Sequence, residues 1–232
     1  FRHPDRRDDV LEHLRTIGDL ERLVSKVACE RISPRELLQV RNALTAIVPL
    51  KRQCMSSGQP QLAAIGEQLN PCEQICARIS REVCDDAGAA SAHGEIIAKG
   101  VNEELDQLRT MAYEGKDFLA KLQAREIEAT GIGSLKIGYN NIFGYYIEVT
   151  NTHKSKVPAE WIRKQTLVNA ERYITPELKE YEEKILGAQE KIEALETRLY
   201  NDLVAAVAQY IPALQLDATM LARLDAVSYT HL

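Results

Sequence analysis

The sequence predicts a mainly α-helical chain in which two long helices pair antiparallel as an arm and carry a small antiparallel β module at the tip. Two heptad patterns of matching length predict the arm, because apolar or small residues step by four and three in each of them. The segment between the patterns, 131–175, holds four of the 12 glycines and six of the 13 aromatic residues, which is typical of strands and turns. The β module is therefore expected where the arm reverses direction.

Composition limits the class of protein before any motif is considered. The 232 residues, 45% of them apolar and 27% charged, allow one large globular domain or a main domain with a smaller one. With 29 Lys plus Arg against 34 Asp plus Glu, the net charge of −5 excludes a chain-wide polycation that coats nucleic acid or membrane. The longest apolar runs, 43–50 and 203–208, are far shorter than the roughly 18 residues that span a membrane. We expect a cytoplasmic protein without membrane contact.

Amphipathic helices are expected before the arm. An apolar face runs through residues 20–27, and Ser33, Pro34 and Glu36 then supply an N-cap, a first-turn proline and a capping-box acid for a second helix. The features expected next are a turn at 56–60, helical segments at 62–69 and 75–79, and a loop at 85–94.

The five cysteines predict reduced thiols, because the number is odd and the chain is long enough to fold without disulfides. Cys72, Cys76 and Cys84 are spaced four and eight residues apart, so we expect them near one face of a helix as small buried side chains. A zinc site is the alternative and would need His93 as its fourth ligand.

The heptad positions define both helices of the arm. Thr175 as N-cap and Pro176 in the first turn open the second helix. Helices over about 101–129 and 176–203 would each extend about 40 Å, so they can pair along their whole length. The seam positions are Val101, Leu105, Leu108, Ala112, Gly115, Leu119 and Leu122 in the first helix, and Leu178, Tyr181, Ile185, Ala188, Ile192, Leu195 and Leu199 in the second.

Alternation of apolar and polar residues predicts strands within the module. Residues 135–139 and 145–150 alternate on either side of an Asn140, Asn141 turn, which predicts a β-hairpin. A second strand pair is expected at about 164–168 and 171–174, turning at Asn169 and Ala170.

The charge of the module differs from that of the remaining chain. Segment 131–175 has six cations and three anions, a net charge of +3, which leaves −8 for the rest. A basic module on an acidic arm favours contact with an anionic partner, and the phosphate backbone of nucleic acid is the leading candidate. A helical arm that binds another protein is the alternative. Most of the aromatic side chains are expected to form the core of the module rather than stack on bases.

The stretch from about 130 to 187, which contains GIGSLKIGYNNIFGYYIEVTNTHKSKVP and IRKQTLVNAERYITPELKEYEEKIL, closely resembles the clamp and descending lever helix of the MutS family of bacterial mismatch-repair proteins. GDLERL at 18–23, ISPREL at 32–37 and ELDQLR at 104–109 resemble its core and lever segments. The resemblance implies a long antiparallel helical lever and core with a small antiparallel β clamp inserted at the tip. The domains it implies are core and lever helices at 1–129, the clamp at 130–175, the returning lever helix and the approach to an ATPase domain at 176–227, and an anomalous tail at 228–232.

In that family two clamps embrace duplex DNA through contacts to its backbone that do not depend on sequence. The resemblance implies double-stranded DNA, a second copy in a homodimer and downstream repair proteins as partners, with ATP and magnesium as cofactors of the full-length protein. A relative used outside mismatch repair is a further alternative. The residues implied for DNA contact are Asn151, Lys154, Lys156, Arg163, Lys164, Gln165, Thr166 and Asn169.

Residues next to the implied DNA contacts are expected to have structural roles. Glu171 and Arg172 are expected to hold the second turn together as an ion pair, and His153 is expected to be an exposed loop residue. The helix pair is expected to act as a stiff lever that couples nucleotide state to the clamp.

Two family motifs are missing from this sequence. No Phe is followed two residues later by Glu, so the mismatch-reading motif is not present. The Gly115, Lys116 pair is followed by Asp117 and preceded by Thr110 where a P-loop requires glycine. We therefore expect no enzyme active site and no bound cofactor in this chain. The last residues, SYTHL, do not continue the resemblance, and no function is expected of them.

Overall fold

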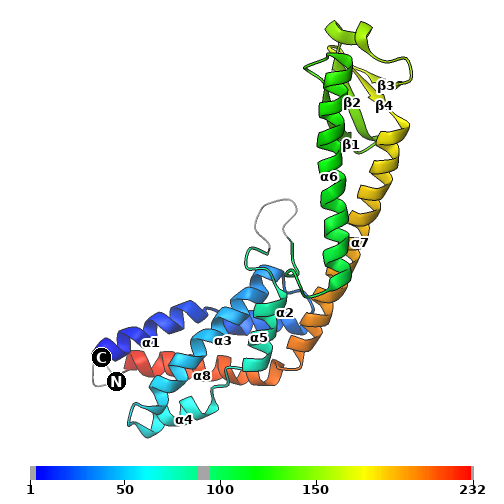
Figure 1. Ribbon diagram of the computed structural model, residues 1–232. Coiled ribbons are helices and arrows are strands. Elements are labelled where there is room, and N and C mark those ends of the chain that lie inside the picture. The colour runs from blue at the N-terminus through cyan, green and yellow to red at the C-terminus, as the bar shows by residue number, and fades with distance from the viewer. Residues whose placement is uncertain (1–3, 88–94, 231–232) are drawn as a thin grey trace. The chain divides into compact units, whose positions relative to one another are not determined.

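In a computed structural model of the protein, residues 4–87 and 95–230 are described, with side chains over 10–87 and 95–226. The chain divides into two compact units (Figure 1). Unit 1 comprises Phe1–Val101 and Glu196–Leu232, and unit 2 comprises Asn102–Leu195. Helices dominate, and a four-stranded antiparallel sheet lies in unit 2, so the predicted mainly α class with a small β part is confirmed.

Unit 1 is a helical bundle built around α3. This helix packs against α1, α2, α4 and α5, while α8 packs against α1, α2 and α4. Its side chains Leu37, Leu44, Ile47 and Leu50 are completely buried, which gives the unit a continuous apolar core. The helices are α1 Pro4–Ile17, α2 Leu20–Ala28, α3 Pro34–Met55, α4 Pro60–Gln68, α5 Glu73–Glu82, the C-terminal part of α7 Pro176–Ala208, and α8 Ile211–Thr230.

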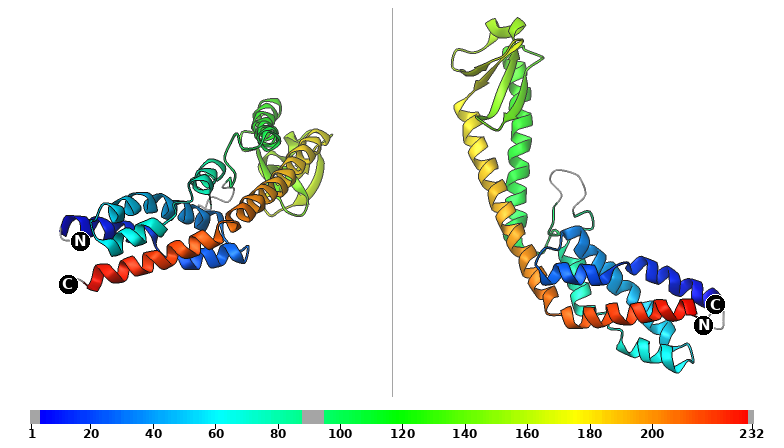
Figure 2. Two further views of the ribbon diagram at one scale, coloured as in Figure 1. Left: turned by 90° about the horizontal axis from the view of Figure 1, so that it is seen from below. Right: turned by 180° about the vertical axis from the view of Figure 1, so that it is seen from behind.

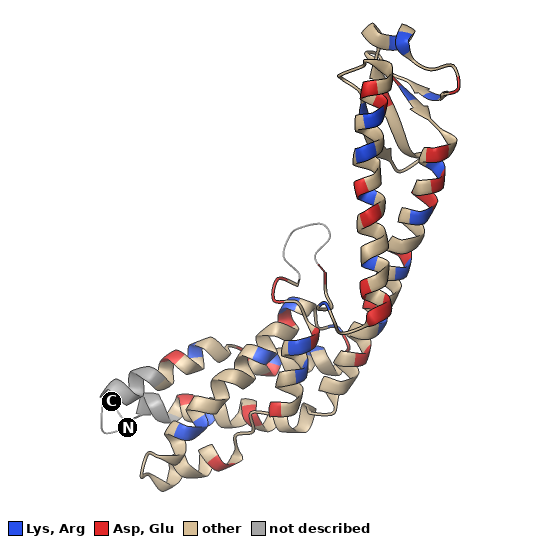
Figure 3. Cartoon of the chain, in the orientation of Figure 1, with Lys and Arg blue, Asp and Glu red and all other residues tan. Residues whose placement is uncertain are grey.

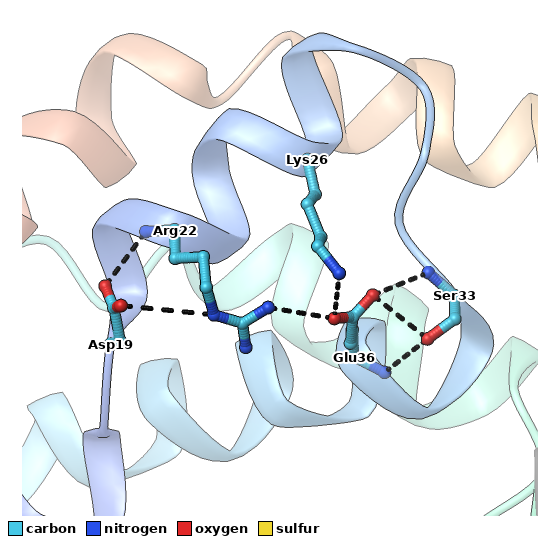
Figure 4. A network of polar contacts seen from close by, with 5 residues as sticks. All are labelled: Asp19, Arg22, Lys26, Ser33 and Glu36. Atoms are coloured by element: carbon cyan, nitrogen blue, oxygen red, sulfur yellow. Dashed lines mark hydrogen bonds and ion pairs between the residues drawn. The ribbon is translucent and has the colours of Figure 1, made fainter.

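The predicted capping box at the start of α3 is confirmed (Figure 4). The Ser33 hydroxyl accepts a hydrogen bond from the Glu36 backbone N–H at 3.3 Å, and the Glu36 carboxylate accepts one from the Ser33 N–H at 3.2 Å. Lys26 and Arg22 of α2 also bind this carboxylate, at 2.5 and 3.0 Å. These charge-assisted bonds, first that from Lys26, lower the pKa of Glu36 to about 2. One side chain thus caps α3 and ties it to α2.

Replacing Ser33 with alanine should lower the free energy of unfolding of unit 1 by about 1 kcal/mol, because the Glu36 N–H loses its acceptor. Urea unfolding followed by far-ultraviolet circular dichroism measures this loss. Ser80→Ala is the matched control, since the Ser80 hydroxyl only donates back to a carbonyl within α5. Equal losses in the two variants would show that the cap contributes nothing specific.

Parts of unit 1 differ from the sequence predictions. Helices α1 and α8 were not predicted. Cys72 precedes α5 with a φ of 45° and Cys84 follows its end, so the three cysteines do not share one helix face as expected. His93 and most of the expected loop at 85–94 lie outside the described residues, and no three potential metal ligands converge in the described part.

Unit 2 consists of a helix pair and a sheet. Helix α6, Glu103–Thr130, lies antiparallel beside α7, as Figure 1 and the right view of Figure 2 show. The strands are β1 Lys136–Asn140, β2 Gly144–Thr150, β3 Ile162–Thr166 and β4 Ala170–Ile174, in the order β1-β2-β4-β3, and a 3-10 helix, η1 Asn151–Lys156, connects β2 to the β3 segment. The predicted arm with an inserted β module is therefore present within this unit.

The seams predicted from the heptads pack the helix pair. Gly115 lets α7 approach so closely that a Cβ at this position would lie 2.5 Å from Ile185 Cγ1. Phe118 stacks on Tyr181 with ring centroids 3.3 Å apart. Most seam positions are buried, namely Leu105, Ala112, Gly115, Leu119 and Leu122 on α6 and Leu178, Ile185, Ala188 and Leu195 on α7.

The bounds of several elements were predicted wrongly. Val101 precedes α6, and α7 continues five residues beyond the expected end. The second strand pair begins at Ile162, turns at 167–169, and places Ala170 inside β4, because Ala170 pairs with Thr150 of β2. Among the described helices, none is long and apolar enough to cross a membrane.

Candidate nucleic-acid interface

One face of the sheet packs on the helix pair. Ile147 of β2 pairs with Tyr173 of β4, and both are buried, as expected for side chains on one face of neighbouring strands. They share a core with Leu122, Leu178 and Trp161. Trp161 and Tyr173 therefore form core, but Tyr139 is exposed and Phe143 and Tyr146 are half-buried, so the prediction that most aromatic side chains of the module form its core is confirmed only in part.

Hydrogen bonds fix the sheet to both helices. The Gln123 side chain of α6 accepts from the Ile137 N–H at 2.8 Å, and Glu182 of α7 accepts from the Tyr145 N–H at 2.5 Å. Gly144 has a φ of 81°, and a Cβ there would collide with the Glu182 carboxylate. The end of the sheet at the β1–β2 turn is thus held by α7. The 3-10 helix η1 follows the other end of β2.

At that opposite end, η1 is joined to the β3–β4 turn. The Asn151 N–H donates to the Asn169 carbonyl at 3.0 Å, and the Asn151 side-chain amide donates to the Val168 carbonyl at 2.9 Å. We call η1, β3 and the turn 167–169 the η1 surface. All eight residues predicted to contact DNA lie on it, which brings together two segments that are separate in the sequence.

Two of the predicted cations share one anion. Lys154 Nζ lies 2.6 Å from Glu171 Oε1, and Arg163 Nη1 lies 3.3 Å from the same oxygen. Glu171 is 2% exposed, whereas the side chains of Lys154 and Arg163 are 54% and 58% exposed. The bond from Lys154, then that from the Tyr173 hydroxyl, lowers the pKa of Glu171 to about 2. Burial raises the pKa of Tyr173 to about 12.

Most of the remaining predicted residues are exposed to solvent. Lys156 and Lys164 are exposed and have no ion-pair partner among the described residues, and a register shift between Arg163 and Gln165 places Lys164 at a bulge. Thr166 and Asn169 are also exposed. Figure 3 shows basic residues on η1, in contrast to the mixed charges along α6 and α7. The surface can therefore bind an anion electrostatically.

The prediction of an ion pair between Glu171 and Arg172 is wrong. Adjacent strand residues point to opposite faces of a sheet, so these two side chains diverge. Arg172 instead binds Glu148 at 2.9 Å and Gln165 at 2.9 Å, and its guanidinium lies 4.2 Å from the centre of the Tyr146 ring. Gln165 is thus half-buried and engaged within the sheet.

Two further features of this region were not foreseen. The predicted loop 151–156 forms η1, and His153 is half-buried rather than exposed, because η1 packs back on β2 and β4. Sequence reasoning also missed Glu171 as the common partner of Lys154 and Arg163. The alternation of β4 carries that signal, since it places Glu171 on the same face as Tyr173 and away from Arg172.

Comparison with known proteins agrees with this architecture. Residues 100–191 match the model of MutS family domain IV, a segment that contains α6, the whole sheet and much of α7.

Curated proteins match nearly the whole chain. It is 63% identical over 225 residues to the DNA mismatch repair protein MutS of Parabacteroides distasonis, 97% of this chain and 26% of that protein. The MutS proteins of Phocaeicola vulgatus and Flavobacterium johnsoniae are 61% and 50% identical, over 97% and 99% of this chain. The chain spans about a quarter of the length of these relatives. It therefore belongs to the MutS family, and residues 100–191 are its domain IV.

Proposed function

We propose that this chain is the lever and clamp region of a DNA mismatch-repair protein, and that its η1 surface contacts the backbone of duplex DNA. The observation that carries the proposal is the convergence of Lys154 and Arg163 on Glu171, with Lys156 and Lys164 exposed on the same two elements, η1 and β3. Cations of this kind bind phosphate irrespective of base sequence. The names of the relatives support the repair role, because each is called a DNA mismatch repair protein.

For the whole protein we propose the properties that its family membership suggests. These are a homodimer whose clamps embrace DNA, an ATPase that uses ATP and magnesium, recruitment of downstream repair proteins, and work in the bacterial cytoplasm on the nucleoid. In this scheme the present chain performs no chemistry. Its helix pair transmits motion to the clamp as a stiff lever, because a packed seam resists bending.

The test measures binding of matched and mismatched duplexes across a salt series by fluorescence anisotropy. We expect this chain to bind both equally, with a log–log salt slope of about −2 to −4, the value for about two to four phosphate contacts. In full-length MutS carrying this segment, Lys156→Gln with Lys164→Gln should weaken binding of both duplexes and reduce the slope by about one for each lysine.

The control replaces an exposed lysine outside the η1 surface. Lys121→Gln removes the same charge from α6, where Lys121 pairs with Asp117 at 2.6 Å, and should leave the slope unchanged. If the double variant binds DNA as the control does while its helicity is retained, the DNA proposal fails and a protein-binding arm becomes the better reading. If the double variant loses affinity for only one of the two duplexes, the η1 surface does not act through backbone contacts alone.

A further inference from the structure

Within the η1 surface, Lys154 and Arg163 converge although they come from different elements. Lys154 belongs to η1 and Arg163 to β3, yet their nitrogens lie 2.6 and 3.3 Å from the same oxygen of Glu171. Because both contact one atom, the ammonium and the guanidinium nitrogen are at most about 6 Å apart. Two cations this close can each donate to a different oxygen of a single phosphate group.

The Glu171 carboxylate is held in place by its strand and by the Tyr173 hydroxyl. Glu171 lies on β4, which is hydrogen-bonded to β2 on one side and β3 on the other. The Tyr173 hydroxyl donates to its second oxygen, and Tyr173 is itself buried against Trp161 with ring centroids 6.0 Å apart. The carboxylate is 2% exposed and both of its oxygens are engaged by Lys154, Arg163 and Tyr173, so it is not the group that meets an external ligand.

The cations keep donors for such a ligand. An ammonium has three N–H donors and a guanidinium has five. Each side chain directs one nitrogen to Glu171, which leaves further N–H donors unused. Both side chains are more than half exposed, so an external ligand can reach them. Without the carboxylate, two like charges at this separation would repel each other and their long side chains would be free to move apart.

We propose that Lys154 and Arg163 together bind one backbone phosphate, and that Glu171 is the positioning residue that holds them at the spacing this requires. The inference rests on the proposed DNA contact and adds which cations act as a pair. It also assigns a buried acid a favourable role in binding a polyanion. Charge alone predicts the opposite, because Glu171 reduces the local charge of the pair from +2 to +1.

Glu171→Gln separates positioning from charge, since it removes the negative charge and nearly preserves the shape. In full-length MutS carrying this segment, we expect duplex binding to weaken about 3- to 10-fold and the log–log salt slope to become shallower by about one, as one phosphate contact is lost. In a Lys154→Ala, Arg163→Ala background, Glu171→Gln should have no further effect on binding.

Glu148→Gln is the matched control. Glu148 lies on the same sheet and also binds an arginine, Arg172 at 2.9 Å, so the substitution gives the same gain of charge without touching the pair. We expect unchanged or slightly tighter binding. If Glu171→Gln binds DNA as well as Glu148→Gln does, the positioning role is refuted, while the DNA contact stands as long as Lys156→Gln with Lys164→Gln still reduces the slope.

A second variant keeps the inference testable should Glu171→Gln disturb the fold, which the fluorescence of buried Trp161 would reveal. Tyr173→Phe removes only the hydroxyl that restrains Glu171 and changes no charge. We expect a smaller loss of affinity in the same direction. Wild-type affinity in a folded Tyr173→Phe protein, together with a misfolded Glu171→Gln, would overturn the proposal.

Discussion

Shortening Ile185 to alanine should lower the free energy of unfolding of unit 2 by about 2–5 kcal/mol. Ile185 is 1% exposed and belongs to the core that joins α6, α7 and the sheet, so its lost side-chain atoms leave a cavity that the rigid helix pair cannot fill. Trp161 is the single tryptophan of the chain and lies in the same core. Urea unfolding followed by its fluorescence therefore reports on unit 2 alone.

The partner of Ile185 gives this prediction a sharper form. In Gly115→Ala the new Cβ would lie 2.5 Å from Ile185 Cγ1, an atom close to the backbone of a side chain with a stiff χ1 angle. Overpacking of this kind costs about 1–3 kcal/mol, against about 1 kcal/mol gained from the better helix propensity of alanine. Gly115→Ala alone should be destabilising for unit 2.

In the Ile185→Ala background the same substitution should become stabilising. The nearest remaining atom of residue 185 is then its Cβ, at 3.8 Å, which is an ordinary contact, so only the propensity gain of about 1 kcal/mol remains. Gly187→Ala on α7 is the control, because a Cβ there meets nothing within 4 Å and should stabilise the wild type directly. If Gly115→Ala has the same sign in both backgrounds, the close approach at this position does not limit the helix pair.

The helix pair was predictable because its signal is local and repeated. Seven predicted positions for each helix step by four and three, six of them inside α6 and seven inside α7, and a run of this length specifies both the secondary structure and the face that is buried. The same reasoning failed for α8. Its buried positions Leu214, Leu221 and Leu224 follow the heptad spacing, but Asp217 occupies the position between the first two and interrupts the apolar pattern. A charged residue in a core thus concealed a helix.

The candidate site was predictable as a set of cations but not as a geometry. Lys154 and Lys164 could be named from charge and from family resemblance. Lys154 pairs with Glu171, whereas Lys164 has no ion-pair partner among the described residues. This difference depends on how β4 pairs with β2 and β3, because that pairing sets Glu171 opposite Val149 and Thr166. Register of this kind depends on contacts between distant segments, and a bulge at Lys164 shifts it by one residue. Local sequence patterns do not contain that information.

Asp217 leads to the second large effect, an increase in the stability of unit 1 when its charge is removed. The side chain is fully buried, accepts a hydrogen bond from the Asn70 N–H at 2.7 Å, and has no partner for its second oxygen among the described residues. Burial raises its pKa to about 6, although the Asn70 bond and the charge of Lys51 oppose the shift, and buried Cys72 lies nearby. Its ionised form is therefore costly in the folded state.

The direction of the pH dependence follows from this shift. The unfolded chain loses the proton near pH 3.8 and the folded chain near pH 6, so within this window the folded state binds more protons. The contribution of Asp217 to stability is then fully favourable below pH 3.8, falls as the pH rises through the window, and stays low above pH 6. Two pKa units correspond to about 3 kcal/mol.

Asp217→Asn should therefore stabilise unit 1 by about 2–3 kcal/mol at pH 8 and by almost nothing at pH 4, since the amide resembles the protonated acid and can still accept from Asn70. Far-ultraviolet circular dichroism in urea measures the difference between variant and wild type at each pH, which cancels the opposite contribution of Glu36. Asp202→Asn, at an exposed site on α7, should change little at either pH. An Asp217→Asn protein that is equally destabilised at pH 8 and pH 4 would show that unit 1 needs this carboxylate for its hydrogen bond and is not strained by its charge.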